Sequence, residues 1–341
     1  MRKILLLVAV FLLAVVAVFW GINRVRSDAG KPALPQIDRR ADGNAGSNAR
    51  QSPNVEDLWG AQDRSPAEDS AAVFNDWLSA VAKGDGLKAE QIRARLMVLL
   101  RGNPKGNQAV YRRAAQILAD RSVESDLKFP LVEILDRAAT PSALRVFLDL
   151  LNQDLSPDLR RRLIAAVSDT GEYYWDKSSF AEVAPMLLQS WRETRDPQLL
   201  QALAVAIAKV GDVNGVNQLV DTVLGQETQS PSYSAAQSAL KFVNNPGLIP
   251  FIGKRLSRVD AGTAEMAVCA DILASMCQVE ATRVLFEWAQ NADGQYAALV
   301  REAFARISDP ASVDYLASFV NAARFKSAFV RTAVLTALKK P

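Results

Sequence analysis

The sequence contains no histidine and only two cysteines among its 341 residues. Without histidine, neither a Ser–His–Asp triad nor a Cys–His pair can be built, and a zinc site with imidazole ligands is excluded as well. The general base best suited to neutral pH is also missing. These absences remove most of the familiar hydrolytic and zinc chemistry from the functions open to this chain.

The two cysteines, Cys269 and Cys277, fall within one predicted helix. Eight residues at a rise of 1.5 Å separate them by about 12 Å, which is too far for a disulfide. Because cysteine is among the most buried residue types, we expect both side chains to be small members of the core. A pair of cysteines neither indicates nor excludes an oxidising compartment.

Charge is balanced over most of the chain. Residues 1–66 hold nine Lys/Arg and six Asp/Glu, and residues 67–341 hold 31 of each. Nucleic-acid binders usually carry a basic stripe that neutralises phosphates, so we expect no nucleic-acid partner. Glycine-rich phosphate loops and calcium loops are missing too. We therefore expect no catalytic residue, no metal and no cofactor.

A long apolar run stands at the N-terminus. Residues 4–22, ILLLVAVFLLAVVAVFWGI, follow Arg2 and Lys3 and match the thickness of a bilayer core. A cleaved signal peptide is the alternative, but its apolar region is normally shorter, about 7–15 residues. We predict a single-pass transmembrane anchor over residues 1–26 that remains uncleaved.

The orientation of this anchor has two interpretations. Five Lys/Arg follow the span within about 18 residues, and the positive-inside rule then favours a cytoplasmic body. A charged start before an apolar core instead resembles a signal anchor, which leaves the body outside. We expect an inner (plasma) membrane protein with a periplasmic or extracytoplasmic body.

Residues 27–66 are rich in Asp, Asn, Gly, Pro, Ser and Arg. So few apolar residues cannot offset the entropy of ordering, and we predict a flexible linker. Leu58 and Trp59 stand out within it as a candidate linear docking motif for a protein partner. The alternative is that this short apolar cluster packs on the body.

From residue 67 onward the apolar residues recur at helical spacing, and no strand alternation competes. Residues 67–140 predict four helices, which we interpret as N-terminal pairs that cap an array. Residues 141–341 predict about six helix pairs at a period of 31–36 residues. Six of the predicted helices begin where a capping residue directly precedes a proline, at 140–141, 156–157, 196–197, 230–231, 245–246 and 309–310. The pattern predicts an all-α fold, an α-solenoid of stacked antiparallel helix pairs.

Two of the predicted second helices carry a family signature. LVREAFARISDP at 299–310 and FVRTAVLTALKKP at 329–341 share Val-Arg, then alanine, then an aliphatic ending. This pattern resembles the second helix of a HEAT repeat. The resemblance implies that Arg301 and Arg331 pair with an acidic residue at a turn of an adjacent repeat, with Asp309 as the candidate. Solvated surface arginines are the alternative.

The predicted array is interrupted by an insertion, GEYYWDKSS, at 171–179. It contains Tyr173, Tyr174 and Trp175, the most suggestive residues of the body. Exposed aromatic side chains anchor interfaces because they order a large rigid area at low entropy cost. We therefore take the three residues as candidate partner-binding residues. The alternative is that they fold back and cover a gap between repeats.

These observations favour a non-enzymatic, membrane-tethered scaffold that binds a protein or peptide partner, with an envelope or secretion complex as the suggested setting. Two alternatives remain at this point. One is an enzyme, because some HEAT-like proteins resemble chromophore lyases and others are base-excision glycosylases. The other is a structural spacer that self-associates.

Overall fold

The computed structural model describes residues 69–172, 174–225, 228, 230–258, 262–321 and 324–339. The chain divides into two compact units, Met1–Asp63 and Arg64–Pro341, and every described helix belongs to the second. Over the described residues the fold is all-α, with sixteen α-helices and no strand. The helices are α2 (Ser70–Ala82), α3 (Gly86–Gly102), α4 (Gln108–Ala119), α5 (Ser125–Ala138), α6 (Pro141–Leu151), α7 (Pro157–Ser168), α8 (Phe180–Glu193), α9 (Pro197–Val210), α10 (Val213–Gly225), α11 (Pro231–Ala239), α12 (Ile249–Leu256), α13 (Thr263–Ser275), α14 (Val279–Asn291), α15 (Ala297–Phe304), α16 (Pro310–Asn321) and α17 (Ala328–Leu338).

The helix starts confirm the pattern of a capping residue before a proline. The side chains of Thr140, Ser156 and Asp196 accept hydrogen bonds from first-turn amides of α6, α7 and α9, each with proline at the first helical position. Ser230 caps α11 in the same way, and Asp309 accepts from the Ser312 amide at 2.9 Å. A capping oxygen and a proline together meet the needs of amides that have no partner within the helix.

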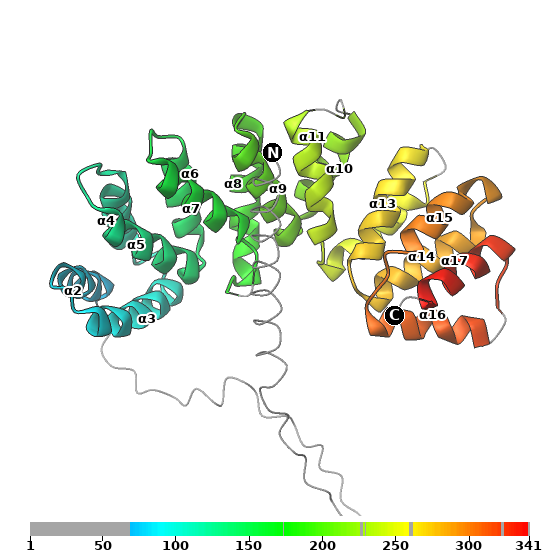
Figure 1. Ribbon diagram of the computed structural model, residues 1–341, viewed down its shortest axis with the longest axis horizontal. Helices are drawn as coiled ribbons and strands as arrows, with labels where there is room; N and C mark the ends of the chain where they lie inside the picture. The colour runs from blue at the N-terminus through cyan, green and yellow to red at the C-terminus, as the bar shows by residue number, and fades with distance from the viewer. Residues whose placement is uncertain are drawn as a thin grey trace, which may run out of the picture. The chain divides into compact units, whose positions relative to one another are not determined.

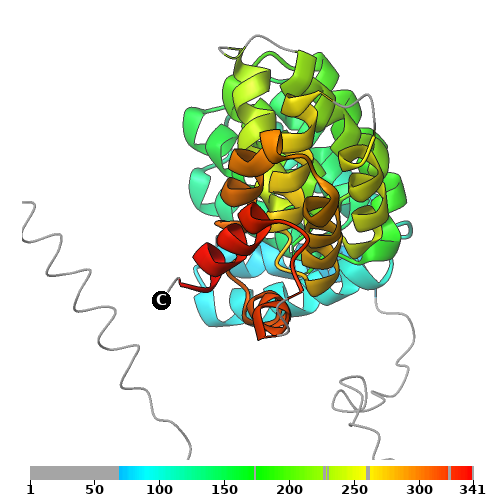
Figure 2. The same ribbon diagram turned by 90° about the vertical axis from the view of Figure 1, so that its right-hand side faces the viewer.

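The helices form successive pairs that follow the chain, as Figure 1 shows. Second helices contact the second helix of the next pair along most of the array, as α3 does α5, and several first helices do likewise, as α4 does α6. Between α11 and α13 the contact is made by the short 3-10 helix Leu240–Phe242 that follows α11. The array therefore has two layers, and its apolar core runs without interruption between them from Val73 to Ala337. Figure 2 views it from the end where α16 and α17 lie. The fold is consistent with the predicted α-solenoid.

This arrangement gives the array two edges. We call the turns within pairs the turn edge; it includes residues 120–124, 152–156 and 194–196, where second helices begin. We call the connections between pairs the loop edge; its described residues include 169–172, 174–176, 211–212, 243–245 and 276–278, which follow second helices. Polar contacts on both edges join residues about one repeat apart, such as Arg121 with Asp154 and Asn245 with the Gly211 carbonyl.

The predicted membrane span, residues 4–22, lies outside the described residues. Among the residues that were described, no helix is both long enough and apolar enough to cross a membrane.

The prediction for the two cysteines was wrong in part. Cys269 is fully buried in α13 as expected, and burial raises the pKa of its thiol to about 12. Cys277 is exposed, and it lies outside that helix because α13 ends at Ser275. Its φ of 53° places it in the left-handed region, which stops the helix before the predicted end.

Candidate functional site

A large open groove, of about 1040 Å³, lies along the loop edge. It crosses four successive connections between pairs, those that follow α7, α9, α11 and α13. Trp175, Phe180 and Phe242 supply its aromatic surface, and Lys177 and Lys241 supply positive charge. We call this hollow the loop-edge groove.

Two glycines let the connections of the groove nest against one another. Gly171 and Gly211 follow second helices and have φ of +91° and +62°, a region that favours glycine. A Cβ atom on Gly171 would lie 2.9 Å from the Cβ of Lys209, and one on Gly211 would lie 2.7 Å from the Cβ of Asn245. Each loop thus packs against the next pair because it lacks a side chain at this point.

Lys209 of α9 contacts the end of α7 and the connection that follows it. Its ammonium donates to the Ser168 carbonyl at 2.7 Å and forms an ion pair with Glu172. Cations are favoured here because helix C-termini such as that of α7 carry partial negative charge. Asp212 is also engaged, since its carboxylate accepts from the amides of Asn214 and Gly215. Both acidic residues of the groove, Glu172 and Asp212, are therefore engaged by partners within the protein.

The other two lysines of the groove are exposed and have no carboxylate partner within the described part of the chain. Lys177 and Lys241 line the groove, and the Lys241 ammonium lies 5.2 Å from the centroid of the Phe242 ring. Phe242 is 39% exposed, which is unusual for a large aromatic side chain. The groove therefore offers apolar surface and unneutralised positive charge side by side.

The insertion at 171–179 divides its aromatic residues between two sides. The Tyr174 hydroxyl accepts a hydrogen bond from Arg137 at 2.7 Å, and its ring lies 5.5 Å and 5.1 Å from the guanidinium groups of Arg101 and Arg137. Trp175 is half-buried against the core and lines the groove. Tyr173 lies outside the described residues. Tyr174 thus contacts earlier pairs, whereas Trp175 is available to a ligand of the groove.

Acidic side chains gather beside the insertion, at the C-terminal ends of α5 and α7. Burial, together with the charge of Asp169, raises the pKa of Asp136 to about 6. Burial and the charge of Glu172 raise the pKa of Asp169 as well. Both carboxylates therefore ionise less readily than usual, and Asp136 titrates near neutral pH.

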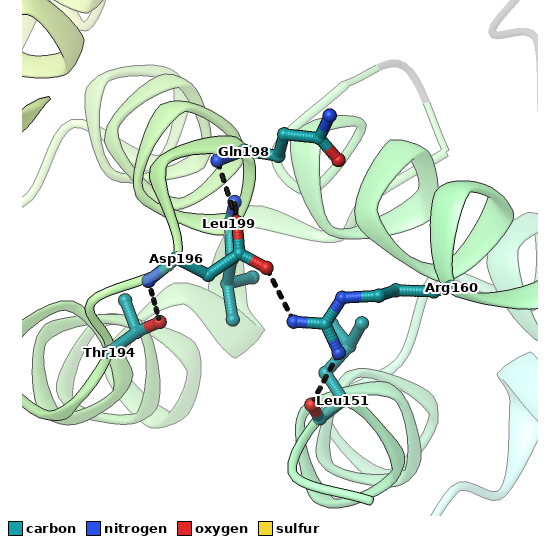
Figure 3. A network of polar contacts seen from close by, with 6 residues as sticks. All are labelled: Leu151, Arg160, Thr194, Asp196, Gln198 and Leu199. Carbon is teal, nitrogen blue, oxygen red and sulfur yellow. Dashed lines mark hydrogen bonds and ion pairs between the residues drawn. The ribbon is translucent and has the colours of Figure 1, made fainter. Parts of the chain in front are cut away.

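On the turn edge, Arg160 of α7 forms the kind of inter-repeat ion pair that the sequence predicted elsewhere. It pairs with Asp196 at the start of α9 and donates to the Leu151 carbonyl at 2.9 Å (Figure 3). Partial burial tends to raise the pKa of Asp196. Hydrogen bonds from Arg160 and from the Gln198 and Leu199 amides outweigh burial, so this pKa lies below its usual range.

The predicted ladder of Arg301, Arg331 and Asp309 does not form in the structure. Arg301 and Arg331 are exposed, and no ion pair joins either of them to Asp309 in the described ranges. The Asp309 carboxylate instead caps α16 through the Ser312 amide. Arg306, in the turn after α15, makes the neighbouring inter-repeat pair, with Asp271. Ala303 and Ala333 are buried, as the helix-packing pattern predicted.

Sequence reasoning missed most of the loop-edge groove. It named Trp175 but not Lys177, Lys241 or Phe242. The available signal was the pair of glycines that follow second helices, Gly171 and Gly211, because glycine at such positions indicates a close approach of loops. The candidate motif of Leu58 and Trp59 lies outside the described residues and stays a prediction.

The described residues hold no cluster of three or more His, Cys, Asp or Glu side chains that could bind a metal ion. What the loop-edge groove offers is a binding surface made of aromatic rings, lysine ammonium groups and backbone turns.

No protein-family model and no curated protein sequence matches this chain.

Proposed function

We propose that the protein is a non-enzymatic scaffold, tethered to a membrane, that binds an extended segment of a protein partner along the loop-edge groove. The observation that carries this proposal is the groove itself, which runs over four successive connections between helix pairs. An open hollow that crosses several repeats presents a continuous surface to a chain segment, as the extended surfaces of solenoids do.

The chemistry of the groove suggests what such a segment contains. Trp175 and Phe242 offer rigid aromatic surface, which favours aromatic or aliphatic side chains in the partner. Lys177 and Lys241 are not neutralised by the acidic residues of the groove, which are engaged elsewhere. Charge complementarity therefore favours a segment in which acidic residues flank the apolar ones.

The fold family and the tether belong to the same proposal. The Val-Arg and alanine pattern of the second helices, with stacking at one-repeat spacing, supports a HEAT-like solenoid. The uncharged run at 4–22 supports a membrane anchor with the body on the extracytoplasmic side, and the polar segment 27–66 supports a flexible tether. Such a tether raises the local concentration of the groove near membrane-bound partners.

Peptide selection on the full-length protein tests the groove. We expect random peptides selected on it to be enriched in aromatic residues next to acidic ones. The double variant Lys241→Glu/Phe242→Ser should bind the selected peptides about tenfold more weakly or worse, because it removes an aromatic contact and inverts a charge. The matched control is Leu224→Ser, which changes a comparably exposed apolar residue outside the groove lining. Equal binding by the double variant, or no enrichment, would contradict the proposal.

Protease accessibility tests the tether. Protease added to intact spheroplasts should digest the body if it lies outside the inner membrane. Protection until the membrane is opened would place the body in the cytoplasm, and the arginines that follow the span would then account for the orientation.

A further inference from the structure

A second hollow, of about 390 Å³, lies on the turn edge between the starts of α5 and α7. Polar residues that line it are Arg121, Ser125, Lys128, Asp154 and Ser156. Its volume falls in the range of about 300–1,000 Å³ that is usual for small-molecule sites. It is separate from the loop-edge groove, and the two share no lining residue.

Lys128 is the unusual member of this lining. The residue is only 8% exposed, and its ammonium group makes no hydrogen bond or ion pair within the described part of the chain. Its charge interacts with that of Asp120, but this carboxylate is exposed and accepts from the amide and hydroxyl of Ser122. The ammonium group therefore has no close anionic partner among the described residues, and the pocket has space for a negative group beside it.

The start of α5 also has groups without a partner, in this case backbone amides that lack a hydrogen-bond acceptor among the described residues. Glu124 stands at the capping position but makes no side-chain hydrogen bond there. No described acceptor receives the amides of Ser125 and Asp126. By contrast, Ser156 caps α7 through the Leu159 amide. Because the side chain of a helical residue leans toward the N-terminus, Lys128 and these free amides converge on one region.

The carboxylate of Asp154 is the only acidic group in the lining, and it does not neutralise Lys128. It pairs with Arg121 instead, and the two side chains are 87% and 76% exposed. This pair therefore lies at the mouth of the pocket, in contact with water. The hydroxyl groups of Ser125 and Ser156 add two further possible donors to the lining.

We propose that the turn-edge pocket binds a small organic anion through an oxyanion, either a phosphate or a carboxylate group. In the bound complex, Lys128 and the first-turn amides of α5 hold the oxyanion, and Ser125 and Ser156 donate from the sides. An anion at this place also interacts favourably with the partial positive charge of the helix N-terminus. The proposal does not depend on the function proposed for the loop-edge groove.

The test uses the full-length protein, titrated with inorganic phosphate or with acetate at constant ionic strength. The readout is the amide NMR signals of Ser125 and Asp126. A saturable shift with phosphate alone assigns the site to phosphate-bearing ligands, and one with acetate alone assigns it to carboxylates. If neither anion gives a saturable shift, the proposal is wrong.

Variants of the pocket separate binding from a general salt effect. Lys128→Met should weaken anion binding about tenfold or more, because a charged hydrogen bond is lost. Without anion, the same variant should unfold at the temperature of the wild type or a higher one, because methionine fills the space of this largely covered side chain without a charge. Lys105→Met, which removes an exposed lysine outside the pocket, should change neither result.

A second variant keeps the proposal testable if Lys128→Met does not fold. Asp154→Asn changes an exposed side chain at the mouth and removes the one carboxylate among the lining residues. It should tighten anion binding about two- to fivefold, as expected for an exposed charge. Unchanged or weaker binding in Asp154→Asn, or wild-type affinity in Lys128→Met, would overturn the proposal.

Discussion

The turn edge and the loop edge consist of the same helix pairs, yet they present opposite ends of the second helices. Carboxylates on the turn edge, such as Asp196, meet helix N-termini and a cation, and the pKa of Asp196 is lowered. Carboxylates on the loop edge, Asp136 and Asp169, lie at helix C-termini and near each other, and both pKa values are raised. The comparison teaches that surroundings decide the direction of the shift: hydrogen bonds from a guanidinium and from first-turn amides outweigh burial at Asp196, whereas burial and neighbouring carboxylates act together at Asp136 and Asp169.

The largest expected effect is a loss of stability when a side chain is introduced between two closely packed loops. Gly211→Ala introduces a side chain at φ +62°, and its Cβ would meet Asn245 at 2.7 Å. The left-handed conformation alone costs about 1–2 kcal/mol, and displacing the next pair adds to this, so we expect a loss of about 2–3 kcal/mol. Chemical denaturation measures this loss in the free energy of unfolding. Gly225→Ala, where nothing lies within 4 Å, should lose no stability.

Removing the main ion pair of the turn edge should have the next largest effect. Asp196→Ala takes the cap from α9 and leaves the partly buried Arg160 without its carboxylate, and we expect a loss of about 1–3 kcal/mol. Arg121→Ala breaks an exposed pair on the same edge and should cost less than about 0.5 kcal/mol. Equal losses in the two variants would mean that burial does not distinguish these pairs.

On the loop edge, removing a carboxylate should stabilise the protein. The folded-state pKa of Asp136 is about 6, above its ordinary value of 3.8. Its contribution is therefore favourable at low pH and is lost as pH rises through about 6. Asp136→Asn should gain about 1–2 kcal/mol near pH 8 after allowance for solvent screening, and nothing near pH 3. Free energies of unfolding, measured for the variant and the wild type between about pH 3 and pH 8, test this prediction.

The matching change on the turn edge should have the opposite sign. Asp196 has a lowered pKa, so its contribution is present above the unfolded-state pKa and is lost as pH falls through the folded-state value. Asp196→Asn should therefore destabilise the protein near neutral pH and have little effect in strong acid. If both asparagine variants changed stability in the same direction, the contrast between the edges would be wrong.

The smallest effect is expected at Cys277, which has a φ of 53° and lies on the loop edge. Cys277→Gly relieves a left-handed conformation but gives the unfolded chain more freedom, so we expect a gain below about 1 kcal/mol. Thermal unfolding measures the change. Cys269→Gly, in the buried interior of α13, should instead destabilise the protein.

The sequence predicted local features, but it did not predict contacts between residues far apart in the chain. The helix starts at Pro157 and Pro197 were predicted because a capping side chain and a proline act within one turn. The ion pair of Arg160 with Asp196 was not predicted, because the two residues lie a full repeat apart. Nothing in the local pattern distinguished Arg160 from Arg301 or Arg331. Which arginine reaches a carboxylate depends on the rotation of each helix against its neighbour.

The sequence by itself determined that the body is helical, where its helices begin, and which faces are apolar, since these features depend on residues three to four positions apart. Only the tertiary structure decided that Trp175 joins Phe242 along one groove, whereas Tyr174 contacts Arg137. It also placed Lys128 in a pocket between two pairs. The physical reason is that such sites form between residues one or more repeats apart, and stacking alone sets their distances.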